Sequence, residues 1–266
     1  MRGVSLPAFT DAGQGATAVL LLHGIGGGRS IWSDHGSQTL ATLAQGGYRA
    51  VAIDLPGYGD SVGTPDMDSM VQAVMDVAGH IGAARTVLLG HSMGGMVALE
   101  LAARHPQQVQ GLILTCTSAS FGKADGAWQA QFIAERLAPL DAGLGMAGMA
   151  QQLVPGLVSS QAPAAALQIA VDVMARVPEA TYRTALRAIA GFDRRAALAQ
   201  IAVPTLLLAA EHDRTAPPEV MQRMAARIAG SSYHCLADAG HIANVEAPAT
   251  FNAAVLAFLH RHFVTD

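Results

Sequence analysis

The chain has 266 residues, enough for one large domain or for a core domain that carries an insertion. Hydrophobic residues make up 51% of it and charged residues only 14%, which excludes the polar, highly charged composition of a disordered protein. The net charge of −4 provides no basic surface for phosphate groups, so we expect no nucleic-acid partner.

The start of the chain carries no recognisable targeting signal. Residues 1–13 contain no apolar stretch of the signal-peptide type, so we expect a cytoplasmic location. The longest charge-free stretch, residues 142–171, is interrupted by Gln, Ser and Pro, so no membrane span is predicted.

Strand-like runs and helix-like segments alternate along most of the chain. Short apolar runs typical of buried strands lie at residues 18–22, 50–53, 86–89, 112–114, 205–209 and 233–236. Apolar residues at helical spacing lie at residues 70–81, 93–101, 220–228 and 250–263. This alternation predicts an α/β fold, with a mostly parallel sheet flanked by helices on both faces.

The alternation stops at residues 119–190, where helix-like pieces follow one another without a strand. We expect a helical cap here, inserted into a core formed by residues 1–118 and 191–266. The apolar side chains of this cap either line the entrance to a site and favour apolar substrates, or pack the cap onto the core. Packing is favoured, because Met at helical spacing is usually a packing residue. These side chains are Leu144, Met146, Met149, Leu153, Leu157 and Val158.

The segment Gly90–Gly94 reads Gly-His-Ser-Met-Gly and lies between a predicted strand and a predicted helix. A serine on such a sharp turn sits in a strained backbone conformation, with its hydroxyl exposed at the carboxyl end of the strand. Flanking glycines leave room where strand and helix cross closely. We therefore predict Ser92 as a nucleophile. His91 points away from the serine on a turn of this kind, so packing or hydrogen bonding is expected of it.

A serine nucleophile needs a base to take its proton, and the base needs a third group to fix its tautomer. His241 and Asp213 each follow a predicted strand within a short turn. The carboxyl ends of parallel strands share one edge of a sheet, so Ser92, Asp213 and His241 are expected to converge there. Glu211, in the same turn as Asp213, is a weaker candidate for the acid.

These motifs make the chain similar to α/β-hydrolases with a serine nucleophile, whose catalytic residues follow the order serine, acid, histidine. The segment His23–Gly28, after the first long strand, resembles the family's glycine-rich loop. The resemblance implies that the N–H groups of Ile25 and Met93 form the oxyanion hole, with Gly26 as the alternative to Ile25. The segment Asp54–Ser61 also resembles a family motif and is expected to be a structural turn.

Within this fold, the chain most resembles 3-oxoadipate enol-lactonases. The similarity lies in the nucleophile turn, the strand and turn that end at Asp213, the segment 240–246, and Trp128 in the cap. It implies substrate contacts by Trp128, Gly24 and Gly26. Such lactonases accept a substrate that bears a carboxylate, so a cationic group is expected to face the pocket. The cap is short of positive charge, which suits an apolar ester better.

The expected activity is hydrolysis of a small carboxylic ester or lactone through an acyl-enzyme on Ser92, by a monomer or small homo-oligomer. Four alternatives stay open on this fold: a carbon–carbon bond hydrolase of ring-cleavage products that uses the same triad, a cofactor-free haloperoxidase-like enzyme, a peptidase that releases terminal proline, and a non-enzymatic small-molecule receptor. No cofactor is expected. The histidines lack metal-ligand spacing, and Cys116 and Cys235 lie in apolar runs, so no metal site is predicted.

Overall fold

The computed structural model describes residues 6–33, 36–122 and 126–263. Within them, one seven-stranded sheet has the order β1-β3-β2-β4-β5-β6-β7, and each neighbouring pair is parallel except β1 and β3. The predicted α/β fold with a mostly parallel sheet is confirmed. The strands are β1 (Phe9–Ala12), β2 (Thr17–Leu22), β3 (Arg49–Ile53), β4 (Arg85–His91), β5 (Gly111–Thr115), β6 (Thr205–Ala210) and β7 (Ser232–Leu236).

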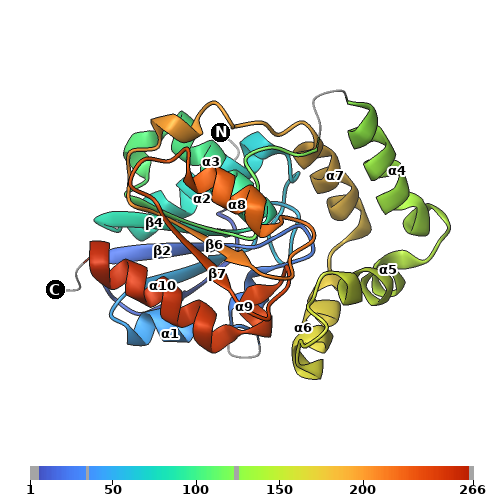
Figure 1. Ribbon diagram of the computed structural model, residues 1–266, viewed down its shortest axis with the longest axis horizontal. Helices are drawn as coiled ribbons and strands as arrows, with labels where there is room; N and C mark the ends of the chain where they lie inside the picture. Colours follow the sequence, from blue (N-terminus) through green and yellow to red (C-terminus); the bar gives the residue numbers. More distant parts are fainter. Residues whose placement is uncertain (1–5, 34–35, 123–125, 264–266) are drawn as a thin grey trace.

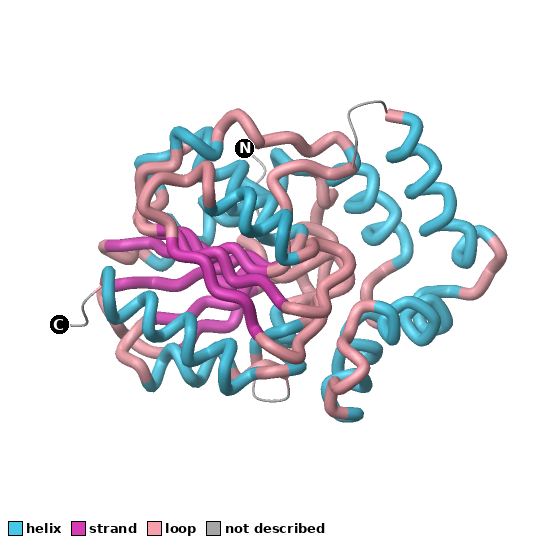
Figure 2. Tube along the Cα trace, in the orientation of Figure 1, coloured by secondary structure: helices cyan, strands magenta, loops and turns pink. Residues whose placement is uncertain are grey.

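Helices cover both faces of this sheet, whose strands are magenta in Figure 2. In Figure 1, α2, α3 and α8 lie on one face, and α1 and α10 lie on the other. None of the helices in the described residues is long and apolar enough to cross a membrane. The α-helices are α1 (Thr39–Gln45), α2 (Met67–Ile81), α3 (Met93–Arg104), α4 (Ala127–Asp141), α5 (Gly145–Leu153), α6 (Ala164–Ala175), α7 (Glu179–Ala190), α8 (Pro218–Ala225), α9 (Ala243–Glu246) and α10 (Pro248–His262), and the short 3-10 helices are η1 (Arg29–Trp32), η2 (Pro106–Gln108), η3 (Val154–Gly156) and η4 (Leu198–Gln200).

Burial on both faces explains why the strands are visible in the sequence. Every residue of β2, β5 and β6 is buried, because helices cover both sides of these parallel strands. The predicted strands all occur, and the predicted helices occur as α2, α3, α8 and α10, although α8 ends at Ala225. β1 and α1 lie outside the predicted elements. β1 is an antiparallel edge strand without a fully buried residue, and α1 is too short for a clear periodic pattern.

The predicted cap region lies between β5 and β6 and contains α4 to α7, with no strand in its described residues. These helices lie beyond the end of the sheet (Figure 1). The two ends of the region meet, since Arg194 N donates to Ala119 O at 2.7 Å and Phe121 N donates to Phe192 O at 2.9 Å. The chain therefore leaves and re-enters the core at one place, as in an insertion. The division at residues 119–190 stays a prediction, and parts of the predicted domains lie outside the described residues, namely 1–5, 34–35, 123–125 and 264–266.

Candidate active site

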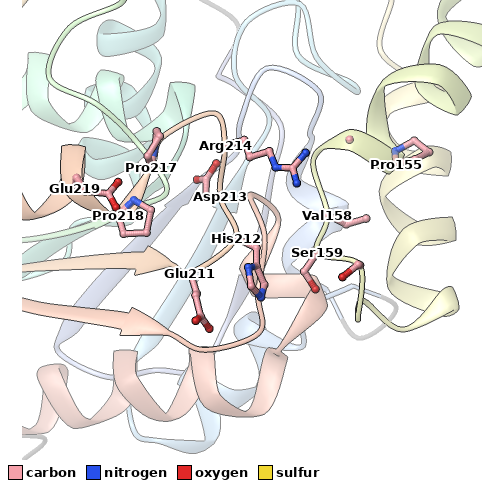
Figure 3. Close-up of a pocket in the computed structure, with 12 residues that line it drawn as sticks. Pro155, Val158, Ser159, Glu211, His212, Asp213, Arg214, Pro217, Pro218 and Glu219 are labelled. Carbon is pink, nitrogen blue, oxygen red and sulfur yellow. The ribbon is translucent and has the colours of Figure 1, made fainter.

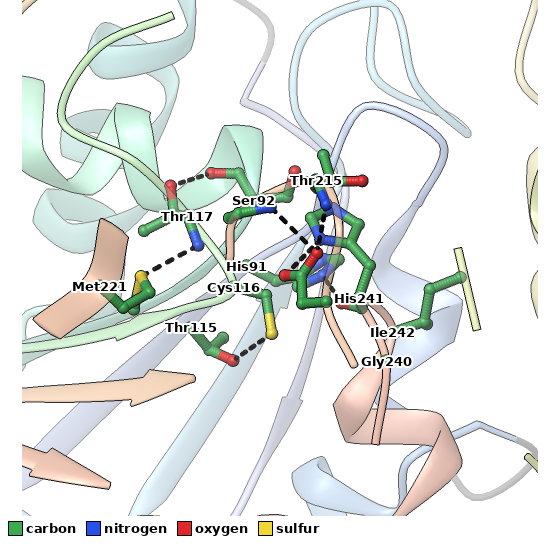
Figure 4. A network of polar contacts seen from close by, with 12 residues as sticks. His91, Ser92, Thr115, Cys116, Thr117, Thr215, Met221, Gly240, His241 and Ile242 are labelled. Atoms are coloured by element: carbon green, nitrogen blue, oxygen red, sulfur yellow. Dashed lines mark hydrogen bonds and ion pairs between the residues drawn. The ribbon is translucent and has the colours of Figure 1, made fainter. Parts of the chain in front are cut away.

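Ser92 lies on the sharp turn between β4 and α3. Its backbone φ of 52° and ψ of −116° fall in a region that residues with a Cβ rarely adopt. Two hydrogen bonds fix the turn: Ser92 N donates to Thr115 O at 3.0 Å, and Thr117 Oγ1 donates to Ser92 O at 2.6 Å (Figure 4). Strained backbone that is held by its surroundings in this way is typical of functional positions.

Two glycines allow α3 to lie close to β4 and to β2 at this turn. A Cβ on Gly90 would lie 2.4 Å from Gly94 O, and a Cβ on Gly94 would lie 2.2 Å from Leu22 O in β2. Neither position accepts a side chain unless the backbone moves, because both contacts are far shorter than van der Waals distance. The glycine spacing of the motif is therefore required by packing around Ser92.

His241 lies beside Ser92 (Figure 4), and Asp213 lies beside His241, although the three residues are far apart in the sequence. His241 Nε2 lies 3.1 Å from Ser92 Oγ, and His241 Nδ1 lies 2.8 Å from Asp213 Oδ2. A carboxylate only accepts hydrogen bonds, so Nδ1 carries the proton and Nε2 accepts from the serine hydroxyl. Residues that follow β4, β6 and β7 thus form one hydrogen-bonded chain at the carboxyl edge of the sheet.

The Asp213 carboxylate is fixed by the main chain as well as by the imidazole. Its Oδ1 accepts from Thr215 N at 2.7 Å and from Ala216 N at 3.0 Å. Burial raises the pKa of Asp213, but the adjacent His241 and the two N–H donors outweigh burial and lower this pKa below its usual value. Asp213 is therefore ionised near neutral pH. Glu211, the weaker candidate for the acid, is exposed and accepts from a main-chain N–H at 3.0 Å instead.

His91 contacts the main chain of the histidine loop. Its Nε2–H donates to His241 O at 2.7 Å. Burial and the neighbouring His241 lower the pKa of His91 to about 3, so the ring is neutral near pH 7. The hydrogen-bonding role expected of His91 is confirmed.

The glycine-rich loop after β2 packs between Ser92 and the cap region. A Cβ on Gly24 would lie 3.2 Å from Ser92 Cβ and 3.0 Å from His91 Nδ1. A Cβ on Gly26 would lie 3.3 Å from Met174 Cγ in α6. The loop therefore contacts the nucleophile turn at one position and the cap region at the other. Substrate contacts by Gly24 and Gly26 stay a prediction.

The predicted oxyanion donors are the main-chain N–H groups of Ile25, in the glycine-rich loop, and of Met93, next to Ser92. Tyr58 OH donates to Ile25 O at 3.0 Å and so fixes the Ile25 backbone. Met93 is the first residue of α3, where N–H groups have no acceptor within the helix. Helix N-termini of this kind favour negative charge, which suits an oxyanion beside Ser92.

A model described as the alpha/beta hydrolase family matches residues 19–254. The chain belongs to the alpha/beta hydrolase family. It is 32% identical to a candidate carbamate hydrolase of Variovorax paradoxus, over 92% of this chain and 92% of that protein. It is 31% identical to a pimeloyl-[acyl-carrier protein] methyl ester esterase of Neisseria meningitidis, again over 92% of each chain. The enol-lactonase of Burkholderia xenovorans has a similar structure, with a TM-score of 0.83, 25% identity and 95% of both chains covered.

Two cavities of this alpha/beta hydrolase lie at the border of core and cap region. The larger, about 580 Å³, lies between residues 155–160 and residues 211–219, and Arg214 lines it (Figure 3). The smaller, about 340 Å³, lies beside the glycine-rich loop and is lined by Arg29 and Arg176. Both cavities carry charges of both signs: Glu211, Asp213 and Glu219 line the larger one, and Asp54 and Asp60, which pair with Arg29, line the smaller one.

Several apolar residues of the cap region pack against one another. Met146 and Met149 are only 7% and 2% exposed, which supports packing as their role. The ring of Trp128 stacks on Phe132 with centroids 5.1 Å apart, also contacts Phe121, and is 37% exposed. A substrate contact by Trp128 stays a prediction.

Within the described residues, one group of side chains has metal-ligand atoms close together. The ligand atoms of Glu211, His212 and Asp238 lie within 4.8 Å of one another, and all three residues are exposed. Asp238 Oδ1 accepts from Gln161 Nε2 at 3.1 Å. These groups take no part in the hydrogen-bonded chain from Ser92 to Asp213.

Thr117 and Glu246 contact the site but were not among the predicted site residues. Thr117 fixes the carbonyl of Ser92 across 25 positions of sequence, and no local pattern signals such a contact. Glu246 accepts hydrogen bonds from the main chain on both sides of His241. Its signal in the sequence was a lone carboxylate within a mostly apolar segment, residues 242–248.

Proposed function

We propose that this protein is a serine hydrolase that cleaves a carboxylic ester or lactone through an acyl-enzyme on Ser92. The observation that carries this function is the hydrogen-bonded chain from Ser92 Oγ through His241 to Asp213, with separations of 3.1 and 2.8 Å. A nucleophile, its base and the group that orients the base are thus in reach of one another.

In the first half of the reaction, Ser92 Oγ attacks the acyl carbon while its proton passes to His241 Nε2. Asp213, which accepts from Nδ1–H, stabilises the imidazolium that forms. The carbonyl oxygen becomes an oxyanion held by the N–H groups of Ile25 and Met93, where one donor is worth about 2.7–4 kcal/mol. Collapse of this intermediate breaks the ester C–O bond, and the leaving oxygen takes the proton from Nε2.

In the second half, a water molecule attacks the acyl-enzyme with His241 as its general base. The same oxyanion donors hold the second tetrahedral intermediate, which releases the carboxylic acid and returns the proton to Ser92 Oγ. The chain itself supplies every group that these steps require, so the expectation of no cofactor is retained. The helical region 119–190 would act as the cap that bounds the acyl and alcohol groups.

The relatives support an ester or lactone as the substrate, since one is named a methyl ester esterase and another an enol-lactonase. Arg214 lines the larger cavity on the side that faces the cap region and is the group that would contact an anionic substrate there (Figure 3). Glu211 and Glu219 also line this cavity, on the side of the core. An apolar substrate stays an alternative, because Leu144 is 39% exposed and Val158 lines the larger cavity, although Met146 and Met149 are buried.

Labelling and turnover together test the function. We expect a fluorophosphonate to label Ser92 and short acyl esters to be hydrolysed, and Ser92→Ala to lose both while remaining folded. Retained turnover in Ser92→Ala would contradict the assignment. Labelling without turnover of any ester or lactone would favour a receptor, and cleavage of ring-fission diketones alone would favour a carbon–carbon bond hydrolase.

A second comparison tests the substrate class. A lactone that bears a carboxylate is expected to have a lower KM than a neutral lactone of the same size, and Arg214→Gln is expected to remove most of that difference. A preference for the neutral compound would favour the apolar substrate. The cytoplasmic location and the monomeric or small homo-oligomeric state expected from the sequence stay predictions.

A further inference from the structure

Glu246 is a buried carboxylate whose hydrogen-bond donors are main-chain N–H groups. Glu246 is only 7% exposed. Oε2 accepts from Ser159 N at 2.7 Å and from Gly240 N at 2.9 Å, and Oε1 accepts from Ile242 N at 3.1 Å. A carboxylate that accepts several N–H groups forms charge-assisted bonds, which are stronger than neutral ones.

Two of these donors flank His241, and the His241 backbone is held as well. His241 N donates to Leu157 O at 2.7 Å, and His241 O accepts from His91 Nε2 at 2.7 Å. The main chain from Gly240 to Ile242 is therefore anchored residue by residue. Because the imidazole is attached to this stretch, its reach towards Ser92 depends on these anchors.

The anchors on one side come from the cap region. Leu157 and Ser159 lie between η3 and α6, within the predicted cap. This segment packs so closely on the histidine loop that a Cβ on Gly240 would lie 2.6 Å from Ser159 N and 2.7 Å from Leu157 O. Residues 157–159 thus pack directly against one side of the loop that carries His241.

We infer that Glu246 is a positioning residue for the hydrolysis proposed above. Its carboxylate holds the main chain on both sides of His241 and joins it to residues 157–159, which keeps Nε2 3.1 Å from Ser92 Oγ. Displacement of the 157–159 segment breaks its bonds to Glu246 and to His241 together. Movement of residues 157–159 away from the histidine loop is therefore expected to misalign the His241 imidazole at the same time.

Glu246→Gln tests this role, because glutamine offers one acceptor oxygen and turns an NH₂ group towards at least one N–H donor. Glu100→Gln is the matched control. Glu100 is another buried carboxylate, 3% exposed, but it pairs with the Arg104 and Arg194 side chains, away from the histidine loop. Both substitutions are expected to lower Tm.

Only Glu246→Gln is expected to lower kcat on a short acyl ester, by about 10- to 100-fold with KM within about twofold, because a misplacement near 1 Å costs about that much. Hydrogen exchange gives a readout that does not depend on activity. The amides of Ser159, Gly240 and Ile242 are expected to exchange faster together in Glu246→Gln, while those of Thr215 and Ala216, which donate to Asp213, keep their protection.

Faster exchange at these three amides with an unchanged kcat would overturn the positioning role and leave Glu246 a structural residue. An equal loss of kcat in Glu100→Gln would overturn it too. If Glu246→Gln does not fold, Glu246→Asp, which keeps both acceptor oxygens on a shorter side chain, is judged by the same two readouts. This inference rests on the proposed function, whose own failure is recognised separately, as absence of turnover and of Ser92 labelling in the unsubstituted protein.

Discussion

His91 donates its Nε2–H to the main-chain carbonyl of His241 at 2.7 Å, across 150 positions of sequence. The two rings lie with centroids 5.0 Å apart. The residue next to the predicted nucleophile therefore holds the predicted base by its backbone. Since Ser92 is fixed on the same turn, the turn and the histidine loop behave as one unit.

The free energy of unfolding is expected to decrease as the pH is lowered, because His91 is buried as a neutral ring. Its pKa of about 3 lies below the unfolded value, so protonation favours the unfolded chain, and the contribution is complete above about pH 6.5 and lost as pH falls towards 3. Between pH 7 and pH 5 the loss from His91 amounts to about 2 kcal/mol. His91→Gln, which keeps an N–H donor, is expected to show a shallower decline of the free energy of unfolding with acid.

Urea titrations at several pH values measure this effect. His234→Gln, at an exposed position, serves as the control and is expected to keep the full decline. His23 is buried and its pKa is also lowered, so part of the decline remains in His91→Gln. Identical pH profiles for His91→Gln and the unsubstituted protein would contradict the prediction.

Ser92→Gly is expected to be more stable than Ser92→Ala by about 1 kcal/mol, because glycine relieves the strain at a φ of 52°. Both variants lack the hydroxyl, so their difference isolates the backbone. At Ala98, within α3, the exchange of Ala for Gly is expected to destabilise by about 1 kcal/mol instead. Thermal or chemical unfolding measures both; equal stability of the two Ser92 variants would remove the evidence for strain.

Gly240→Ala is expected to destabilise the fold by about 1–3 kcal/mol and to lower kcat, because the new Cβ would meet Ser159 N and Leu157 O. Gly79→Ala, in α2, has no atom within 4 Å of the added Cβ and is expected to stabilise by about 0.5–1 kcal/mol. Unfolding curves and ester turnover compare the two. A Gly240→Ala variant with full stability and activity would show that the loop and residues 157–159 separate easily.

Asp213→Asn is expected to lower kcat about 10⁴-fold, because an amide no longer holds the required tautomer of His241. Glu211→Gln is expected to leave kcat within about twofold, since Glu211 is exposed and contacts neither Ser92 nor His241 through its hydrogen bonds. Steady-state kinetics on one ester decide between the two carboxylates. A large loss in Glu211→Gln and a small one in Asp213→Asn would transfer the role of the acid to Glu211.

Local sequence patterns were sufficient for six of the seven strands in the described sheet and for the residues around Ser92. Apolar runs such as 18–22 and 205–209 form strands that are buried on both faces, and a continuous apolar run is the sequence pattern that such burial requires. The exposed edge strand β1 carries no such pattern and was therefore not predicted. Helical spacing favoured packing for Met146 and Met149 over a place in the substrate entrance, and their burial supports packing.

The sequence by itself determined the α/β class and pointed to Ser92, Asp213 and His241, because each of these residues lies in a turn whose chemistry is local. Tertiary structure decided how their loops are held. Glu246 bonds to Ser159 across 87 positions of sequence, and Arg214 meets a cavity that two distant segments enclose. Contacts of this kind join segments that are far apart in the sequence. Hydrophobic periodicity and turn residues describe only neighbouring positions, so they do not predict which distant segments meet.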